Sequence, residues 1–379
     1  SGVEWSGVEW RGVADAVGAA QFGVGTPGGT EALCHAAQVE AGRRPGHAFV
    51  ALDMRNAFPS LDRDAVLAAV SLHAPYLLPY ARLFLGRRSF YRYLGANGDG
   101  EALPADQGVD QGDPLAPAFL AVTIRRPLER LEARLRELAE EEGFEPAAAA
   151  DAVRVRAYLD DVLVRVPGSL AARVPAEAAA ALAEVGGDLN TAKTQVWPAA
   201  DGCPPGCDAW WVPSGLVLLG GPLADEDELT DGAALLGSQG FVRGFLDSKL
   251  RQFEAFLAGV ERTVEEAAPH LPRAQSGNLL LRTCGLGRLT HLTRLLPPAA
   301  TAGFAEAADA AALATFTKLA GLDDLSGLQQ RQARLSFRRG GLGLRSLHER
   351  RSAAWVGSWL TTLPRVRSSC PAGWAGKEL

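Results

Sequence analysis

Several features are missing from the sequence, and each absence excludes a class of protein. No apolar run reaches the roughly 18 residues that a membrane-spanning helix needs. The five cysteines form no even, regular framework, which is typical of reduced thiols inside a cell rather than of a disulfide-stapled secreted domain. The N-terminus lacks the pattern of a signal peptide. We therefore expect an intracellular protein without a membrane segment.

A zinc site and a strongly basic surface are missing as well. Cys203 and Cys207 flank Pro-Pro-Gly, but no second Cys/His pair lies near them, so a plain loop is favoured over a zinc site. The net charge of −6 argues against a protein whose whole surface binds nucleic acid. Any nucleic-acid site must therefore be a local patch.

Two adjacent carboxylates, Asp160 and Asp161, stand at the centre of the chain's pattern. Apolar runs rich in Val flank them on both sides and predict two strands. Because Asp favours turns, we expect a hairpin with both carboxylates at its tip. The simplest interpretation is a solvated turn, but two carboxylates this close also suit Mg²⁺ or Mn²⁺.

A third carboxylate bears on this choice. His47 to Leu52 predicts a buried strand that ends at Asp53. If that strand and the hairpin are neighbours in one sheet, Asp53, Asp160 and Asp161 converge at one edge. Three carboxylates are the ligand set for two divalent ions about 3.5–4 Å apart, which clamp the attacking and leaving oxygens of a phosphoryl transfer.

The remaining pattern predicts a chain in two parts. The first 222 residues contain predicted strands and helices, with a short linker at 147–150. After about residue 223 the pattern becomes mostly helical. Helices are expected at 30–41, from Ser60 or Asp62 to His73, and at 116–142, 171–185, 241–266, 276–296 and 299–319.

Two stretches combine arginines with aromatic residues or glycines. Between Tyr76 and Tyr93 aromatic and basic residues interleave, which fits either a helix and strand with solvated Arg side chains or a surface that follows a phosphate backbone. Near the C-terminus a basic cluster surrounds Gly340–Leu344 and is either a nucleic-acid patch or an incidental surface. It consists of Arg331, Arg334, Arg338, Arg339, Arg345, Arg350 and Arg351.

Ordered sequence blocks carry a family resemblance. Phe49–Phe58 looks like a D-x-x-x-A-F/Y block, and Ala157–Asp161 looks like a Y-x-D-D box. The other blocks are Gln107–Pro117 (G-x-x-Q-G-x-P-L-S-P, with Ala at the usual Ser), Gly187–Thr194 (G-L-x-L-N-x-x-K-T), Leu218–Gly220 (the L-G grip) and the weaker Gly340–Ser346. In this order they resemble the palm of reverse transcriptases, most closely those of non-LTR retrotransposons.

The resemblance implies an α+β polymerase right-hand fold. Its palm would have an antiparallel sheet with packed helices, followed by an all-α thumb and a C-terminal extension. The implied domains are a remnant of the fingers (1–46), the palm with fingers elements (47–222), a thumb-like region (223–325) and a basic extension (326–379). The implied activity is that of an RNA-directed DNA polymerase of a retroelement, acting in the nucleus on an RNA template, a DNA primer and dNTP.

The resemblance also implies roles for single residues. Asp53 and Asp160 would bind two Mg²⁺ (or Mn²⁺) ions with Asp161 in support, and Lys193 would neutralise or protonate the leaving diphosphate. Phe58 would stack under the sugar and exclude a 2′-hydroxyl. The implied nucleotide site consists of Asn56, Ala57, Phe58, Gln111 and Gly112, and the implied primer grip of Leu219 and Gly220.

Two other functions compete with this one. The short segment before the first block lacks recognisable basic fingers, which favours a catalytically silent, reverse-transcriptase-like protein that binds RNA as a scaffold. An RNA-dependent RNA polymerase would share the palm, but Ala57-Phe58 disfavours it, because that class must admit the 2′-hydroxyl.

Overall fold

The described residues of this computed structural model form a mixed helix and sheet fold, as the sequence predicts. They are 7–43, 46–95, 100–198, 202–224, 240–267 and 270–370. The chain divides into two compact units, the first made of Ser1–Leu219 with Thr362–Leu379 and the second of Gly220–Thr361. The stretch 326–379, expected to be one extension, is thus divided between the two units.

β1 (His47–Arg55) is the central strand of the first unit. It pairs antiparallel with β5 (Asp161–Pro167) on one side and with β6 (Asp188–Leu189) and β7 (Gln195–Pro198) on the other. β4 (Arg154–Tyr158) pairs antiparallel with β5 and forms the predicted hairpin. Of the two strands predicted around the Asp pair, β5 is therefore the direct neighbour of the strand that carries Asp53, and β4 lies beyond it.

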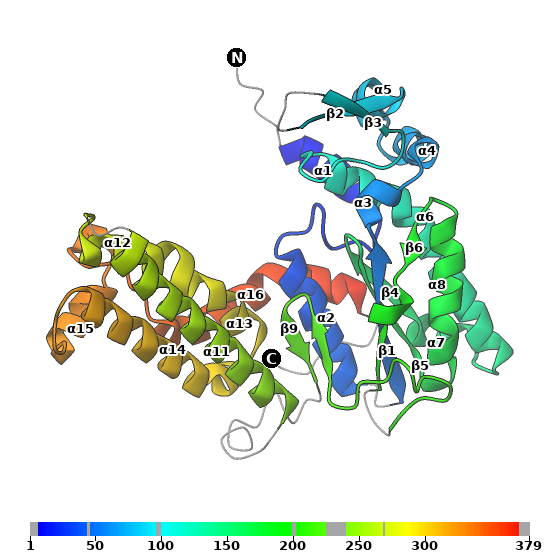
Figure 1. Ribbon diagram of the computed structural model, residues 1–379. Helices are drawn as coiled ribbons and strands as arrows, with labels where there is room; N and C mark the ends of the chain where they lie inside the picture. Colours follow the sequence, from blue (N-terminus) through cyan, green and yellow to red (C-terminus); the bar gives the residue numbers. More distant parts are fainter. Residues whose placement is uncertain are drawn as a thin grey trace. The chain divides into compact units, whose positions relative to one another are not determined.

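The two faces of this sheet are covered by different helices (Figure 1). Val50, Val155 and Val164 lie on one face and belong to the main hydrophobic core, together with residues of α6 (Ala116–Glu141) and α8 (Val174–Ala183). The opposite face carries the alternate residues of each strand and packs on α2 (Gly29–Arg43). Alternation along β1 therefore places the side chain of Asp53 on the α2 face.

A buried ion-pair cluster joins α2 to that second face. Glu40 accepts hydrogen bonds from Arg156 at 2.6 and 2.8 Å and lies 3.2 Å from Arg165. All three side chains are almost completely buried. The cluster stabilises the sheet only while all its charges are paired, since an unpaired charge is costly at such a site.

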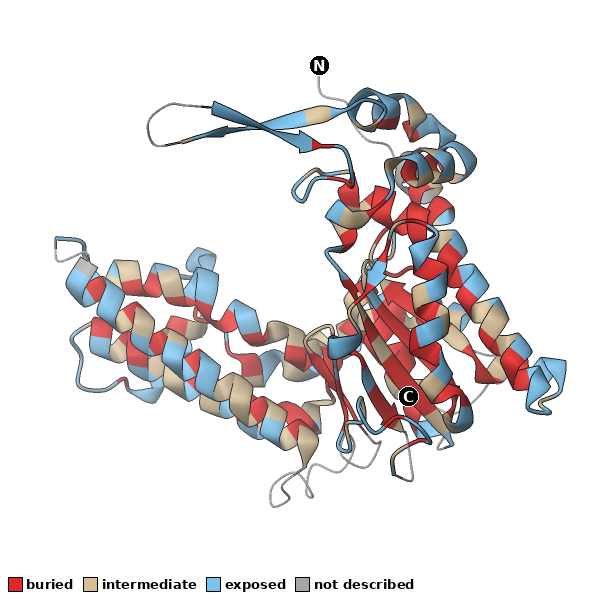
Figure 2. Cartoon of the chain, turned by 45° about the vertical axis from the view of Figure 1, so that its right-hand side comes forward, coloured by how far each residue is buried: buried red, intermediate tan, exposed pale blue. Residues whose placement is uncertain are grey.

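The first unit contains further short elements. The remaining helices are α1 (Gly7–Val17), α3 (Ala57–Ser60), α4 (Arg63–His73), α5 (Leu78–Leu85) and α7 (Pro146–Ala152). Of the two predicted caps, Ser60 and Asp62, it is Asp62 that caps α4, by accepting from the backbone N–H of Ala65 at 2.9 Å. β2 (Ser89–Leu94) and β3 (Gly100–Ala105) form a hairpin that Figure 2 shows to be mostly exposed. Its aromatic side chains Phe90, Tyr91 and Tyr93 are exposed.

The second unit is helical, as predicted after residue 223. Its helices are α11 (Phe241–Arg262), α12 (Arg273–Leu280), α13 (Thr290–Leu295), α14 (Pro298–Leu319), α15 (Gly327–Arg334) and the start of α16 (Leu347–Ser369). No helix among the described residues is both long and apolar enough to span a bilayer.

Two sequence predictions about helices were wrong, and a third predicted helix has different bounds. The helix expected over 276–296 is broken into α12, a π-turn at Leu281–Gly285, a 3-10 turn and α13, because Gly285 adopts a non-helical conformation. The expected linker at 147–150 is helix α7, which Pro146 begins at its first position. The helix expected over 171–185 begins as a 3-10 turn, Gly168–Arg173, and ends at Ala183.

Candidate active site

Asp53 and Asp161 lie directly opposite each other on β1 and β5. Residues in this register have Cβ atoms about 4.5–5.5 Å apart and point to the same face of the sheet. Asp53 is half-buried and Asp161 is exposed. The end of the sheet therefore holds two carboxylates side by side, on the face opposite the main core.

Asp160 lies in the two-residue loop, Leu159–Asp160, that closes the β4–β5 hairpin. Two-residue loops require a positive φ at their first central residue, and Leu159 has φ of 56°. For a bulky residue this backbone costs on the order of 1–3 kcal/mol and persists only with support from its surroundings. The register places Asp161, rather than Asp160, opposite Asp53.

Lys193 and Asn190 hold the carboxylate of Asp53. The Nζ atom of Lys193 lies 3.3 Å from Oδ1 and 3.2 Å from Oδ2, and Nδ2 of Asn190 donates to Oδ2 at 3.1 Å. The backbone N–H of Asn190 donates to the carbonyl of Asp53 at 2.8 Å. The structure thus brings together two predicted catalytic residues, and it adds Asn190, which sequence reasoning quoted in a block without a role.

Negative charge remains in excess at this edge of the sheet. Partial shielding of its carboxyl from water, together with the charges of Asp160 and Asp53, raises the pKa of Asp161, and only the positive charge of Lys193 opposes this. A divalent cation would relieve the repulsion, because it would neutralise the carboxylates that face each other.

The donor set fits a cation that arrives with its substrate. Among the residues that the structure describes, no group of three or more His, Cys, Asp or Glu side chains is arranged to hold a metal ion. Mg²⁺, however, is commonly bound by one or two carboxylates together with substrate phosphates, rather than by a cage made only of protein. Asp53 and Asp161 supply such a pair, with Asp160 beside them.

Asn56, Ala57 and Phe58 continue directly from the strand that carries Asp53. Asn56 is exposed and has φ of 48°, while Ala57 is buried and Phe58 is half-buried against the core. The carbonyl of Phe58 accepts from the backbone N–H of Val109 at 2.9 Å. This bond joins the first predicted block to the block that contains Gln111.

Gln111 and Gly112 are exposed in the turn before α6. Gln111 lines an open cavity of about 520 Å³ whose other lining residues include Pro59, Tyr91 and Asp110. A Cβ on Gly108 would lie 2.3 Å from the carbonyl oxygen of Pro59, so only glycine permits the two blocks to approach this closely. The predicted nucleotide residues therefore come from two segments in contact.

The predicted primer grip is the turn of a short hairpin. Leu219 and Gly220 stand between β8 (Leu216–Leu218) and β9 (Gly221–Leu223), and both have a positive φ. The boundary between the two units falls between these two residues. Their predicted role stays a prediction.

Gln21 supports the carboxylate hairpin, and sequence reasoning missed it. Its side chain is buried, and its Oε1 accepts the backbone N–H groups of Leu159 and Gly23, each at 2.8 Å. Its Nε2 lies 3.5 Å from the carbonyl oxygen of Leu159. A Cβ on Gly23 would lie 2.8 Å from the nitrogen of Leu159. The available signal was a glutamine between apolar residues in a glycine-rich stretch.

The segment that carries Gln21 is itself held from both sides. Phe22 and Ala20 exchange backbone hydrogen bonds with Ala157 of β4, at 2.7 and 2.8 Å. From α16, Nη2 of Arg365 donates to the carbonyls of Ala19 and Gln21 at 2.7 and 2.9 Å. Residues 19–22, within the stretch expected to be a fingers remnant, thus lie along β4, beside the hairpin.

Comparisons with known proteins give distant structural likenesses. No family model and no curated protein matches the chain. Apo telomerase from Candida tropicalis is similar over 98% of this chain and 59% of its own, at 11% identity and a TM-score of 0.42. Telomerase from Candida albicans with the TWJ fragment of telomeric RNA is similar over 95% and 56%, at 11% identity and a TM-score of 0.36. The chain spans between half and three fifths of these structures.

Proposed function

We propose that the chain is an RNA-directed DNA polymerase of a retroelement, of the non-LTR type. The observation that carries the proposal is the register of Asp53 opposite Asp161, with Lys193 bound to Asp53. The contact between Phe58 and Val109 supports it, because it joins two blocks that a nucleotide site would need together.

In the proposed reaction, the 3′ oxygen of a DNA primer bonds to the α-phosphorus of a dNTP and diphosphate leaves. Two Mg²⁺ or Mn²⁺ ions, when bound, would lower the pKa of the attacking hydroxyl and offset charge on the diphosphate. Asp53 and Asp161 would hold them from facing strands, with Asp160 alongside. Lys193 would supply positive charge or a proton to the leaving group.

Other residues of the chain would select and place the substrates. Phe58 would exclude a 2′-hydroxyl and so favour dNTP over rNTP, next to Asn56 and Ala57. Gln111 and Gly112 would line the nucleotide and template site. The helices of the second unit would form the thumb, and Leu219 with Gly220 would hold the primer end.

Primer extension on an RNA template tests the proposal. Wild type should incorporate dNTP with Mg²⁺ and stop when the metal is chelated, while Asp53→Asn and Asp161→Asn should each lose at least about 10³-fold in rate, since each removes stabilisation of transition-state charge worth several kcal/mol. Asp208→Asn, at an exposed position in the loop after β7, is a matched control and should keep wild-type activity.

One observation favours the silent alternative. Asp53 is already neutralised by Lys193 and bonded by Asn190, as a purely structural ion pair would be. If wild type binds RNA but incorporates no nucleotide with either Mg²⁺ or Mn²⁺, the scaffold function replaces the polymerase. A preference for rNTP would instead indicate an RNA polymerase.

A further inference from the structure

A second cavity, in the unit Gly220–Thr361, is lined by arginines. Its volume is about 550 Å³. Arg282 and Arg294 come from the broken helix region, and Arg345 and Arg350 come from the glycine-rich block and the start of α16. Only Arg345 and Arg350 belong to the cluster seen in the sequence, so the fold assembles this basic site from segments that are far apart in the chain.

Two of the arginines that line the cavity, Arg345 and Arg350, have no carboxylate partner among the described residues. None of the described residues that line it is acidic. Arg334 of the same cluster, in contrast, binds Glu349 at 2.8 Å. Uncompensated arginines at a concave surface attract phosphate, because the planar guanidinium matches phosphate oxygens.

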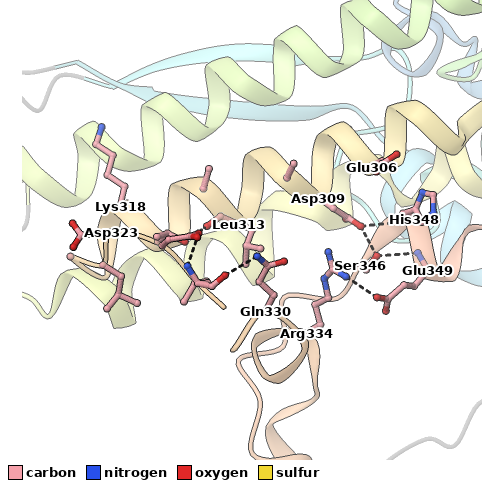
Figure 3. Close-up of a pocket in the computed structure, with 17 residues that line it drawn as sticks. Glu306, Asp309, Leu313, Lys318, Asp323, Gln330, Arg334, Ser346, His348 and Glu349 are labelled. Carbon is pink, nitrogen blue, oxygen red and sulfur yellow. Dashed lines mark hydrogen bonds and ion pairs between the residues drawn. The ribbon is translucent and has the colours of Figure 1, made fainter. Parts of the chain in front are cut away.

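A neighbouring cavity shows the contrast. Figure 3 shows this larger space, of about 990 Å³, lined by Glu306, Asp309, Asp323 and Glu349. There Asp309 accepts from the hydroxyl of Ser346 and from the backbone N–H of His348. Ser346 lines both cavities. Acidic side chains thus line the larger cavity, whereas the smaller one is lined by Arg345 and Arg350, which have no carboxylate partner among the described residues.

An aromatic ring accompanies the arginines. Phe337 is exposed to 52%, and the guanidinium of Arg282 lies over its ring at 4.5 Å from the centroid. A Cβ on Gly343, which has φ of 72°, would lie 2.9 Å from Cδ of Arg282 and 3.5 Å from Phe337. Gly343 therefore lets the stacked pair form at the edge of the cavity.

We propose that this cavity binds a single strand of nucleic acid, with phosphates on Arg282, Arg345 and Arg350 and a base stacked at Phe337. A basic groove with an exposed aromatic ring is the arrangement that single-strand binding uses. A duplex keeps its bases stacked inside and would leave Phe337 without a partner. The inference concerns binding alone and does not depend on polymerase activity.

The test measures binding of labelled single-stranded RNA and DNA to the full chain by fluorescence anisotropy, without dNTP and over a range of salt. Arg345→Ala/Arg350→Ala should weaken binding at least about tenfold and lower the slope of log affinity against log salt by about 1.4, since each phosphate contact to a single strand contributes about 0.7. Arg338→Ala/Arg339→Ala is the matched control, because both arginines are exposed but line no part of the cavity. Thermal melting should show all variants folded.

Phe337→Leu tests the stacked base separately. It should weaken oligonucleotide binding about five- to 100-fold, in line with base stacking on an aromatic ring, and leave binding of inorganic polyphosphate unchanged, because polyphosphate carries charge but no bases. Equal losses of oligonucleotide affinity in Arg345→Ala/Arg350→Ala and in Arg338→Ala/Arg339→Ala would overturn the proposed site. A larger loss for duplex than for single strands, or no loss with Phe337→Leu, would overturn the single-strand assignment.

Discussion

The amide oxygen of Gln21 accepts the backbone N–H of Leu159 at 2.8 Å, one residue before the Asp pair. The two residues are far apart in the sequence, and the bond fixes a backbone that a leucine rarely adopts. Gln21 is therefore a positioning residue for the carboxylates, although it reaches neither of them.

Replacing Gln21 should impair metal use more than stability. Gln21→Met keeps the volume but leaves two buried N–H groups without an acceptor, so the turn should relax. We expect kcat of primer extension to fall about 10- to 100-fold. The Mg²⁺ concentration that gives half-maximal activity should rise, and KM for dNTP should change little. A metal titration checks this. Gln195→Ala, at an exposed position of β7, is the control. An unchanged metal titration in Gln21→Met would show a merely structural role.

Lys193 should matter for rate and little for stability. Its side chain is 65% exposed, and exposed ion pairs contribute about 0–1 kcal/mol. Lys193→Ala should lower kcat about 10²- to 10⁴-fold if it donates a proton, with a melting temperature near that of wild type. Lys193→Arg separates charge from proton donation, since Arg keeps the charge but does not release a proton at neutral pH. Full activity of Lys193→Arg would rule out proton donation by Lys193.

Gly→Ala substitutions at Gly108 and Gly143 permit a matched comparison of the free energy of unfolding. Both have a positive φ, but a Cβ on Gly108 would meet the carbonyl of Pro59 at 2.3 Å, while a Cβ on Gly143 meets nothing within 4 Å. Gly143→Ala should cost about 1 kcal/mol from backbone strain alone, and Gly108→Ala clearly more, because the loop must also move. Urea unfolding of both variants measures the difference, and equal costs would contradict the close approach.

The buried cluster around Glu40 should make stability sensitive to acid. Burial alone would raise the pKa of Glu40, but the charges of Arg156 and Arg165 and the hydrogen bonds from Arg156 outweigh it and lower the pKa. Its contribution is thus present above the unfolded-state pKa, about 4.3 for Glu, and is lost as the pH falls through the lower pKa of the folded state. Melting curves from neutral to acid pH measure this loss.

The same cluster permits a sharper comparison. Glu40→Gln should destabilise the protein by about 3–5 kcal/mol, because it removes the buried carboxylate that faces Arg156 and Arg165. A triple variant, Glu40→Leu with Arg156→Met and Arg165→Met, should recover most of that loss and show less dependence on acid pH. A triple variant as unstable as Glu40→Gln would show that packing, rather than unpaired charge, sets the cost.

Local patterns in the sequence predicted the elements of the site but not its supports. The β4–β5 hairpin and the strand ending at Asp53 follow from apolar runs and turn residues, which are local signals. The contact of Gln21 with Leu159 and that of Glu40 with Arg156 depend on pairing between distant segments. Arg156 and Arg165 would be assigned to a solvated strand face if α2 were not known to cover them. The arginine cavity could not be predicted from the sequence for the same reason, since Arg282 and Arg345 are distant in the chain and line one cavity only in the folded protein.

Through the hydrogen bonds from Arg365 to Ala19 and Gln21, the support of the carboxylate hairpin depends on a residue that is synthesised late. Every quoted sequence block up to the weaker Gly340–Ser346 emerges from the ribosome before Arg365 does, and folding begins from the N-terminal side. The nascent chain therefore contains Asp160 and Asp161 before Arg365 is available to form hydrogen bonds with Ala19 and Gln21. We expect a chain truncated before Arg365 to retain every quoted sequence block but to lack the hydrogen bonds that hold Ala19 and Gln21. These two hydrogen bonds can therefore form only after α16 has been synthesised.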